Sequence, residues 1–203
     1  MDKTSYFDRA KDDEWARREY TKEEHAAIDW FMDVAGISAG QKVLEPGCGT
    51  GRCTQKLSVR VGRGGEVVAV DPSAAMIREC RRRTEGLHNV RLLQMPVEDI
   101  EFPPGFFDHV FCLCVFPHFD DKARVIGLFR SLLLPLGRLT VAHLEGSRIL
   151  NRMHRERGGP VKSDRIPPYA EMARLLGASG FRVDFFRDED DGYLLVATRQ
   201  EGR

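Results

Sequence analysis

A glycine-dense turn near residue 47 carries the strongest chemical signal in the sequence. Residues 43–52 read VLEPGCGTGR, so a short apolar stretch runs into the turn and a helix-prone stretch follows it. Glycines such as Gly47 and Gly49 allow the backbone to turn sharply and to approach a ligand closely. In an open α/β sheet, ligands bind beyond the carboxyl ends of the strands, where this turn is expected to lie. We therefore expect a binding loop here rather than a tight turn without function.

A carboxylate ends the next apolar stretch. Asp71 follows residues 67–70, VVAV, about twenty residues after the turn, which is the interval typical of a ribose-binding acid. Such a side chain can accept hydrogen bonds from both ribose hydroxyls. Asp71 alone could equally cap a helix that starts at Ser73. Together with the glycine turn, however, it predicts a nucleoside site.

The glycine spacing and an acidic neighbour indicate which nucleoside the turn would hold. A dinucleotide-binding turn reads Gly-x-Gly-x-x-Gly, whereas Gly47, Gly49 and Gly51 give Gly-x-Gly-x-Gly. Glu45 lies two residues before the first of these glycines, and its carboxylate would repel a phosphate but attract an ammonium group. The turn therefore favours a cationic sulfonium nucleoside over NAD.

From Lys42 onward, short apolar stretches alternate with longer amphipathic ones, which is the pattern of βαβ units around a parallel sheet. The expected strands are residues 42–45, 66–70, 90–94, 109–114 and 138–143. The expected helices are residues 51–61, 73–84, 121–134 and 169–179. Two further strands, residues 181–186 and 193–198, flank an acidic turn and predict a terminal hairpin with one antiparallel strand. We expect one α/β domain.

Two segments are expected to flank the site. Residues 1–41 are charged and helix-prone, and Thr21 and Glu24 have the spacing of a capping box. The part before that box is either a lid or a packed N-terminal arm. Residues 146–168 are polar and contain glycine and proline, so they are expected to form an insertion over the active site. Residues 42–203 form the domain itself.

The chain from residue 42 onward resembles the class I S-adenosylmethionine-dependent methyltransferase family, and within it a bacterial small-molecule branch. The motifs that carry the resemblance are Glu45-x-Gly47-x-Gly49, Asp71, and residues 94–99, 107–112 and 134–139. The last of these resembles the family's usual turn before the fifth strand. The resemblance implies a Rossmann-like, doubly wound sheet of seven strands in the order 3-2-1-4-5-7-6, with strand 7 antiparallel.

The resemblance also implies that S-adenosylmethionine is the cofactor. The residues it places around that cofactor are Glu45, Gly47, Cys48, Gly49, Asp71, Pro72, Met76, Val97, Glu98 and Cys112. The glycine turn would hold the methionine part, the strand-end acid the ribose, and residues 94–99 the adenine. Relatives usually have Gly-Asp-Ala where this chain has MPV, so the acid that contacts adenine is missing at Pro96. We expect Glu98 to take the place of this acid and the Val97 amide to make a second contact with the ring.

Three histidines are the candidates for catalysis on the acceptor side: His118, His143 and His154. Methyl transfer needs an aligned nucleophile shielded from water, and a base only if the acceptor must lose a proton. Each histidine also has a plainer interpretation. His118 could be a partly exposed residue near a helix start, His143 a satisfied core residue, and His154 part of a solvated helix face. The stretch from His143 to Asp164 resembles the same bacterial branch, without naming the acceptor.

Two other chemistries are compatible with these residues. The three histidines, with Glu145 or Asp164, could ligate zinc, but no pair has a tight ligand interval, so we expect no metal. Cys112 and Cys114 would face the same side of a strand, which is compatible with a thiophilic acceptor such as arsenite. Small apolar core residues are the simpler explanation of two strand cysteines.

Composition excludes several classes of protein. The chain has 203 residues, with 31 Lys plus Arg and 31 Asp plus Glu, so no global field would gather nucleic acid or an anionic membrane. The five cysteines lie in or beside apolar stretches, which is typical of reduced thiols in the cytoplasm. The first residues lack the apolar core of a signal peptide, and the longest apolar run, residues 110–116, is too short to span a bilayer. We expect a cytoplasmic monomer or homodimer.

These features together predict an S-adenosylmethionine-dependent methyltransferase that acts on an unidentified small-molecule acceptor. One alternative is a protein that binds the nucleoside without turnover, as a sensor or as a partner subunit. A NAD-dependent oxidoreductase is the other alternative, and the glycine spacing argues against it. The fold alone does not choose among the three.

Overall fold

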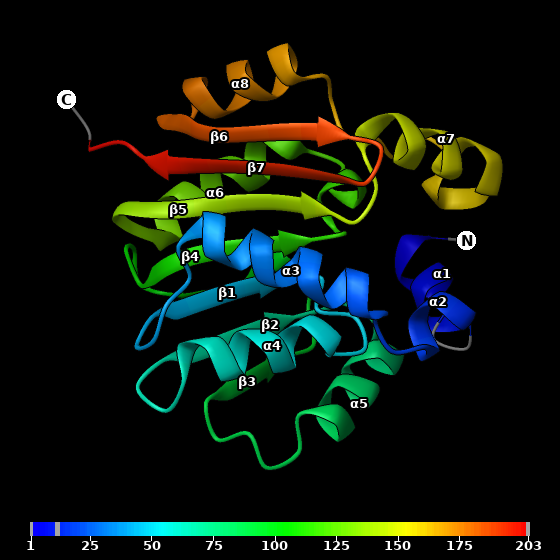
Figure 1. The fold of residues 1–203 in the computed structure, drawn as a ribbon, viewed down its shortest axis with the longest axis horizontal. Helices are drawn as coiled ribbons and strands as arrows, with labels where there is room; N and C mark the ends of the chain where they lie inside the picture. The colour runs from blue at the N-terminus through cyan, green and yellow to red at the C-terminus, as the bar shows by residue number, and fades with distance from the viewer. Residues whose placement is uncertain (1, 11–12, 202–203) are drawn as a thin grey trace.

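A seven-stranded sheet forms the centre of the computed structural model, which describes residues 2–10 and 13–201 (Figure 1). The strands are β1 (Lys42–Pro46), β2 (Glu66–Val70), β3 (Val90–Leu93), β4 (Phe107–Leu113), β5 (Leu133–His143), β6 (Phe181–Glu189) and β7 (Gly192–Arg199). Their order is β3-β2-β1-β4-β5-β7-β6. β7 runs antiparallel to both of its neighbours, and the other neighbouring pairs are parallel. The predicted fold class, strand order and antiparallel seventh strand are confirmed.

Helices cover both faces of the sheet. They are α1 (Lys3–Ala10), α2 (Glu14–Arg17), α3 (Lys22–Ala35), α4 (Arg52–Val61), α5 (Ala74–Arg83), α6 (Lys122–Leu132), α7 (Ser147–Arg157) and α8 (Tyr169–Ala178). Apolar residues of α3, α4 and α5 pack against one face, and those of α6 and α8 pack against the other. None of the helices in the described ranges has the length and apolar character needed to cross a membrane.

Side chains alternate between the two faces along the central strands, as the two-residue period of a strand requires. In β2, Val67 and Ala69 join the apolar cluster beneath α4, whereas Val68 and Val70 join the cluster beneath α6. The register pairs Val70 with Pro46, the last residue of β1. The turns after β1 and β2 therefore leave the sheet side by side, at the same edge.

The capping box predicted at Thr21 starts α3. The Thr21 hydroxyl accepts a hydrogen bond from the Glu24 amide at 3.2 Å, and the Glu24 carboxylate accepts one from the Thr21 amide at 2.8 Å. These bonds satisfy amides that the first turn of a helix leaves without partners. Ile28, Phe31 and Met32 then fall on the buried face of the helix.

Residues 134–137, where a turn before the fifth strand is expected, interrupt the pairing of β5 with β4. β5 already begins at Leu133, which lies opposite Phe107 of β4, and the next pair joins His109 to Arg138. The extra residues on β5 therefore have no counterpart on β4. Leu136 has a left-handed φ of 62°, so the chain turns here, but β5 begins at Leu133 and therefore before this turn, not after it as expected.

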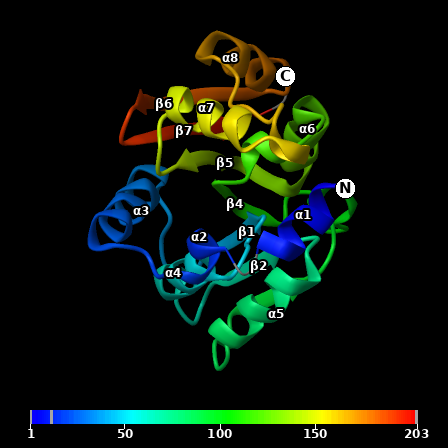
Figure 2. The ribbon, with the colours of Figure 1, turned by 90° about the vertical axis from the view of Figure 1, so that its right-hand side faces the viewer.

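The two flanking segments form helices beyond the carboxyl ends of the strands. Figure 1 shows α1, α2 and α7 beyond the right-hand end of the sheet, and Figure 2 views the molecule from that side. Residues 146–168, expected as an insertion, contain α7 and the 3-10 turn Gly159–Val161. In the N-terminal segment, Ala10 of α1 packs with Met76 of α5 in a small buried cluster. This segment is thus packed against the domain.

Asp8 fastens α1 to the amino-terminal end of α5. Its carboxylate oxygen Oδ1 accepts hydrogen bonds from the Ser73 hydroxyl at 2.6 Å and from the Ala75 amide at 3.1 Å. These bonds hold the pKa of Asp8 below its ordinary value. Because the amides at the start of a helix lack helical partners and carry partial positive charge, a carboxylate is well suited to this position.

Replacing Asp8 by Ala is expected to loosen α1 without unfolding the sheet. The change removes the shared acceptor of two donors, at a cost of about 1 kcal/mol, or about a fivefold change in the opening equilibrium of α1. Hydrogen–deuterium exchange should accelerate in residues 3–10 while the amides of β1 and β4 keep their rates. A Glu101→Ala variant removes an exposed carboxylate elsewhere and serves as the control. Equal exchange of α1 in both variants would contradict the anchor.

Candidate active site

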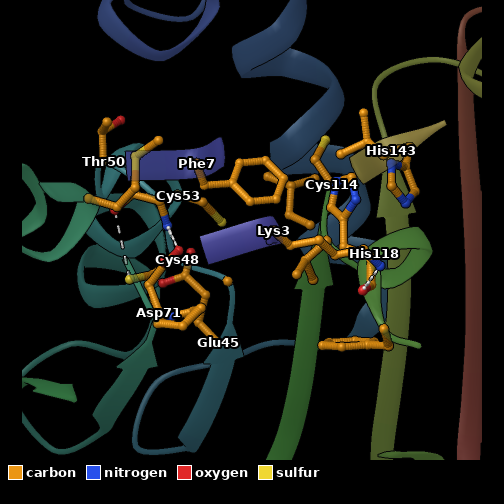
Figure 3. A pocket seen from close by; sticks show the side chains of 18 of the residues that line it. Lys3, Phe7, Glu45, Cys48, Thr50, Cys53, Asp71, Cys114, His118 and His143 are labelled. Atoms are coloured by element: carbon orange, nitrogen blue, oxygen red, sulfur yellow. Dashed lines mark hydrogen bonds between the residues drawn. The ribbon is translucent and has the colours of Figure 1, made fainter. Parts of the chain in front are cut away.

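A cavity of about 430 Å³ lies beyond the carboxyl ends of the central strands. The segments that follow β1, β2, β3, β4 and β5 line it, together with α1 and α7. Figure 3 shows Glu45, Cys48 and Asp71 on one side of the cavity, and His118 and His143 on the other. We call these the glycine-turn side and the histidine side.

The glycine turn leaves no room for a side chain at Gly47. Gly47 has a φ of 65°, and a Cβ there would lie 2.3 Å from Cγ2 of Val115. The Cys48 amide donates a hydrogen bond to the Val70 carbonyl at 3.1 Å, which ties the turn to the end of β2. Gly49 has a φ of 54°, and a Cβ there would meet nothing within 4 Å. The backbone of the turn therefore borders open space at Gly49.

Gly51 allows α4 to start against α5. It has a φ of 84°, and a Cβ at this position would lie 2.9 Å from the Cα of Cys80. A side chain would therefore push the two helices apart. Glycine at this position therefore permits the close packing of α4 against α5.

Asp71 is held in place by two main-chain amides. Gly49 donates to Oδ2 at 3.0 Å and Ser73 donates to Oδ1 at 2.9 Å. Burial raises the pKa of Asp71 to about 6, against the lowering effect of these two hydrogen bonds. Each carboxylate oxygen has a further lone pair, so the group can still accept hydrogen bonds from a ligand in the cavity.

Glu45 is a buried carboxyl group beside the cavity. The Thr54 hydroxyl donates to its Oε2 at 2.6 Å, and the residue is 2% exposed. Burial raises the pKa of Glu45 to about 7, although hydrogen bonds from Thr54 and Cys53 act in the opposite direction. No salt bridge to Glu45 exists within residues 2–10 and 13–201. A cationic ligand in the cavity would therefore meet a carboxylate that lacks a counter-ion.

Most residues predicted around a cofactor line this cavity. They are Glu45, Gly47, Cys48, Gly49, Asp71, Pro72, Met76, Val97 and Glu98. Pro96 also lines it, just before the 3-10 turn Val97–Asp99. The segment expected to frame an adenine ring thus borders the same cavity as the glycine turn.

Cys112 is the exception, because it is fully buried in the core cluster beneath α6. Cys114 lines the cavity in its place, with Leu113 and Val115. β4 ends at Leu113, and Cys114 has a left-handed φ of 56°. The sequence predicted that the two thiols would face the same side of a strand. They do not, because the strand, and with it the two-residue alternation of side chains, ends before Cys114.

The three predicted histidines lie together on the histidine side, and all three line the cavity. His118 comes from the 3-10 turn after β4, His143 from the last residue of β5, and His154 from α7. The ring centroids of His118 and His154 are 5.1 Å apart. Phe7 of α1 packs edge-on against His118 with a centroid distance of 5.0 Å. Four separate elements thus meet here.

His143 is buried, and within the described residues neither of its ring nitrogens has a hydrogen-bond partner. Burial lowers the pKa of His143 to about 3, so the ring is neutral. An unpartnered polar group in the interior costs free energy. The interpretation of His143 as a satisfied core residue is therefore wrong.

From the sequence, Asp164 was predicted only as a possible zinc ligand, and Lys3 was not predicted as a site residue. The Asp164 carboxylate oxygen Oδ2 bonds His118 Nδ1 at 2.7 Å, and its main-chain oxygen bonds His154 Nδ1 at 2.9 Å. The Lys3 ammonium lies 2.8 Å from Asp164 Oδ1. These contacts join residues that are not neighbours in the sequence, so no local sequence pattern predicts them.

Several cavity residues from the N-terminal segment were also missed, among them Tyr6, Phe7 and Tyr20. Aromatic residues among the charges of a surface segment are the one cue that the sequence offers for them. Metal binding has no support from the described side chains, because no three or more of their His, Cys, Asp or Glu groups could hold an ion together.

The sequence and the fold match known proteins. Residues 43–137 match the family model of the methyltransferase domain. The ubiquinone/menaquinone biosynthesis C-methyltransferase UbiE of Pectobacterium atrosepticum is 34% identical over 113 residues, which are 54% of this chain and 45% of the relative. The chain thus spans about half the length of the curated relatives it matches.

Solved structures share the architecture at low sequence identity. A SAM-dependent methyltransferase from Aquifex aeolicus superposes with a TM-score of 0.73 at 21% identity, covering 98% of this chain and 100% of the other. The cyclase SpnF gives a TM-score of 0.73 at 16% identity, with 92% and 84% covered. These likenesses show the fold. The family model covers just under half of the chain, and the matched stretch contains the glycine turn, Asp71 and strands β2 to β4. In this stretch and in its fold, the chain is similar to class I S-adenosylmethionine-dependent methyltransferases.

Proposed function

We propose that the protein binds S-adenosylmethionine on the glycine-turn side of the cavity and transfers its methyl group to a small molecule held on the histidine side. The observation that carries the proposal is the convergence of Glu45, the glycine turn and Asp71 on one edge of a single cavity. The similarity to the methyltransferase domain supports the identity of the methyl donor.

The glycine-turn side fits the chemistry of this donor. Glu45 is a buried carboxyl without a counter-ion, which suits the ammonium group of the methionine part. Asp71 keeps lone pairs for two ribose hydroxyls, and Gly49 leaves room for the ligand beside the backbone. Val97 and Glu98 would contact adenine, with Glu98 in the role of the acid missing at Pro96.

S-adenosylmethionine carries its methyl group on a positively charged sulfur, and the neutral thioether that departs from the methyl carbon is a good leaving group. The protein must therefore align the acceptor and exclude water. Phe7 of α1 and Leu150 and Met153 of α7 line the cavity with apolar surface. We assign the N-terminal arm and the segment 146–168 the function of covering the acceptor.

The three histidines would face the acceptor. His143 is neutral and unpartnered, so it can donate one hydrogen bond and accept another. His118 and His154 each use Nδ1 in a protein hydrogen bond, which leaves Nε2 of each ring for the acceptor. A base is needed only if the acceptor loses a proton.

The acceptor is proposed only as a small molecule. UbiE is named a C-methyltransferase, but this chain spans less than half of that relative. The equal numbers of acidic and basic residues give no global attraction to nucleic acid. Cytoplasmic location and a monomeric or homodimeric state stay predictions from composition.

Asp71→Asn is expected to weaken binding of S-adenosylhomocysteine by about tenfold to a hundredfold. The amide keeps the volume of the side chain but offers one accepting oxygen where the carboxylate offers two, at a cost of about 1–3 kcal/mol. Isothermal titration calorimetry measures the affinity. Glu101→Gln is the control, because it changes an exposed carboxylate elsewhere by the same chemistry. Unchanged affinity in Asp71→Asn would remove Asp71 from the site.

Glu45→Gln is expected to stabilise the ligand-free protein above neutral pH while weakening ligand binding. The folded-state pKa of Glu45, about 7, lies above the ordinary value of 4.5, so the folded protein binds an extra proton between these pH values. The free energy of unfolding therefore falls as the pH rises through this window, and the penalty is complete above it.

Urea unfolding of both proteins at about pH 4 and about pH 8 measures this penalty. The two proteins should differ little at the lower pH, and the variant should be more stable by up to about 3 kcal/mol at the higher pH. Asp71 titrates in both proteins and cancels in the comparison. A variant that is less stable at both pH values would show that Glu45 has a structural role only.

Turnover is tested by incubating the protein with S-adenosylmethionine and a panel of phenols, hydroquinones, thiols, amines and carbon acids. Formation of S-adenosylhomocysteine that depends on one acceptor class is the expected result. Ligand binding without turnover across the panel would favour a sensor or partner subunit. NAD binding in preference to S-adenosylhomocysteine would favour an oxidoreductase.

A further inference from the structure

We infer that Asp164 is a positioning residue that presents Nε2 of His118 to the acceptor as a general base, and that Lys3 of α1 completes this arrangement. The inference rests on the proposed function and narrows its substrate class to acceptors that lose a proton as they are methylated. It is carried by three contacts of Asp164, with His118, His154 and Lys3, that bring three distant segments of the chain together.

The contact between His118 and Asp164 fixes the tautomer of the imidazole ring. A carboxylate can only accept hydrogen bonds, so the 2.7 Å contact requires that His118 Nδ1 carries the proton. Burial opposes ionisation of Asp164, but the hydrogen bonds from His118 and Lys3 outweigh it, and the pKa of Asp164 lies below its ordinary value. In the neutral ring, Nε2 then holds the lone pair.

The same residue fixes a second imidazole through a different atom. The main-chain carbonyl of Asp164 accepts a hydrogen bond from His154 Nδ1 at 2.9 Å. Burial lowers the pKa of His154, which favours the neutral ring. Each ring, when neutral, therefore presents Nε2 as an acceptor, but only the His118 contact depends on the side chain at position 164. This difference provides an internal control.

Lys3 ties the arrangement to α1. Its ammonium bonds Asp164 Oδ1 at 2.8 Å, Asp120 Oδ1 at 2.6 Å and the main-chain oxygen of His118 at 2.8 Å. These hydrogen bonds raise the pKa of Lys3 against the opposing effect of its burial, so the group is charged. Both oxygens of the Asp164 carboxylate are thus held, and Phe7 of the same helix packs on the His118 ring.

The proton balance follows from this geometry. The acceptor gives its proton to Nε2 of His118, and the electron pair left on the acceptor forms the new bond to the methyl carbon. The electron pair of the broken carbon–sulfur bond stays on sulfur. His118 becomes an imidazolium whose charge is compensated by the Asp164 carboxylate, as in other carboxylate–imidazole pairs, and it then releases the proton to water. A hydroxyl, an enol, a thiol or a carbon acid meets this requirement, whereas a tertiary amine does not.

The test reads the tautomers directly, by long-range ¹H–¹⁵N correlation NMR on protein labelled with ¹⁵N-histidine. In the wild type, His118 and His154 should both be protonated on Nδ1. In Asp164→Ala, His118 should lose its preference for Nδ1 while His154 keeps its own, because the main-chain carbonyl remains. Asp164→Asn, which preserves the volume, should shift His118 toward the Nε2-protonated tautomer, because the amide can donate to Nδ1.

Lys3 is tested by the same spectra. Lys3→Met should speed the exchange of the His118 Nδ1 proton with water and the deuterium exchange of α1 amides. Lys22→Met removes an exposed lysine at the start of α3 and should change neither. Equal exchange in the two lysine variants would show that Lys3 does not support the pair.

Binding of S-adenosylhomocysteine separates this inference from the proposed function. Asp164→Ala should bind it within about threefold of the wild type, because no contact on the glycine-turn side is changed. A wild type that does not bind S-adenosylhomocysteine would refute the proposed function, whatever the tautomers are. A His118 tautomer that is unchanged in both Asp164 variants, or a His154 tautomer that changes with it, would overturn the inference.

Discussion

The hydrogen bond from the Gly49 amide to the Asp71 carboxylate joins the turn after β1 to the end of β2, and the cavity depends on it. The bond requires the left-handed backbone of Gly49, the burial of Asp71 and the strand register that sets Pro46 beside Val70. A slip of one residue in that register would turn every side chain of the strand to the other face. The pairing of β1 with β2 therefore also determines the geometry of the site, and the helices packed on both faces of the sheet hold this pairing in place.

The buried carboxyl groups of Glu45 and Asp71 reduce the stability of the ligand-free folded state, and the same two groups form the proposed binding site. Burial raises the pKa of Glu45 and of Asp71, which means that their charged forms are disfavoured in the ligand-free protein. The apolar clusters on the two faces of the sheet offset this cost. A ligand that supplies a cation to one group and hydroxyls to the other would remove it. Perturbed pKa values of this kind are concentrated at functional sites.

The sequence predicts the sheet and the glycine-turn side well because both depend on local patterns. Apolar runs of strand length identify β1 and β2, and glycine spacing with a strand-end acid identifies the turn and Asp71. His118 and His143 were identified by their positions at the ends of expected strands and His154 by its position in the expected insertion, but the hydrogen-bond partners of these histidines were not predicted. Lys3 and Asp164 are far apart in the sequence, and Cys114 is a left-handed residue that directly follows β4. Contacts between side chains at such large sequence separations follow no periodic pattern, so they cannot be read from the sequence.

The position of β7 between β5 and β6 has a consequence for synthesis of the chain. β6 is hydrogen-bonded to β7 in the sheet, while β5 meets β7 on its other edge. His143, at the end of β5, lies opposite Tyr193 of β7. On the ribosome, β6 therefore emerges before the strand with which it pairs. The edge of β5 that contains His143 stays unpaired until β7 inserts between β5 and β6. The nascent protein would gain its histidine side last, long after the glycine turn has left the exit tunnel.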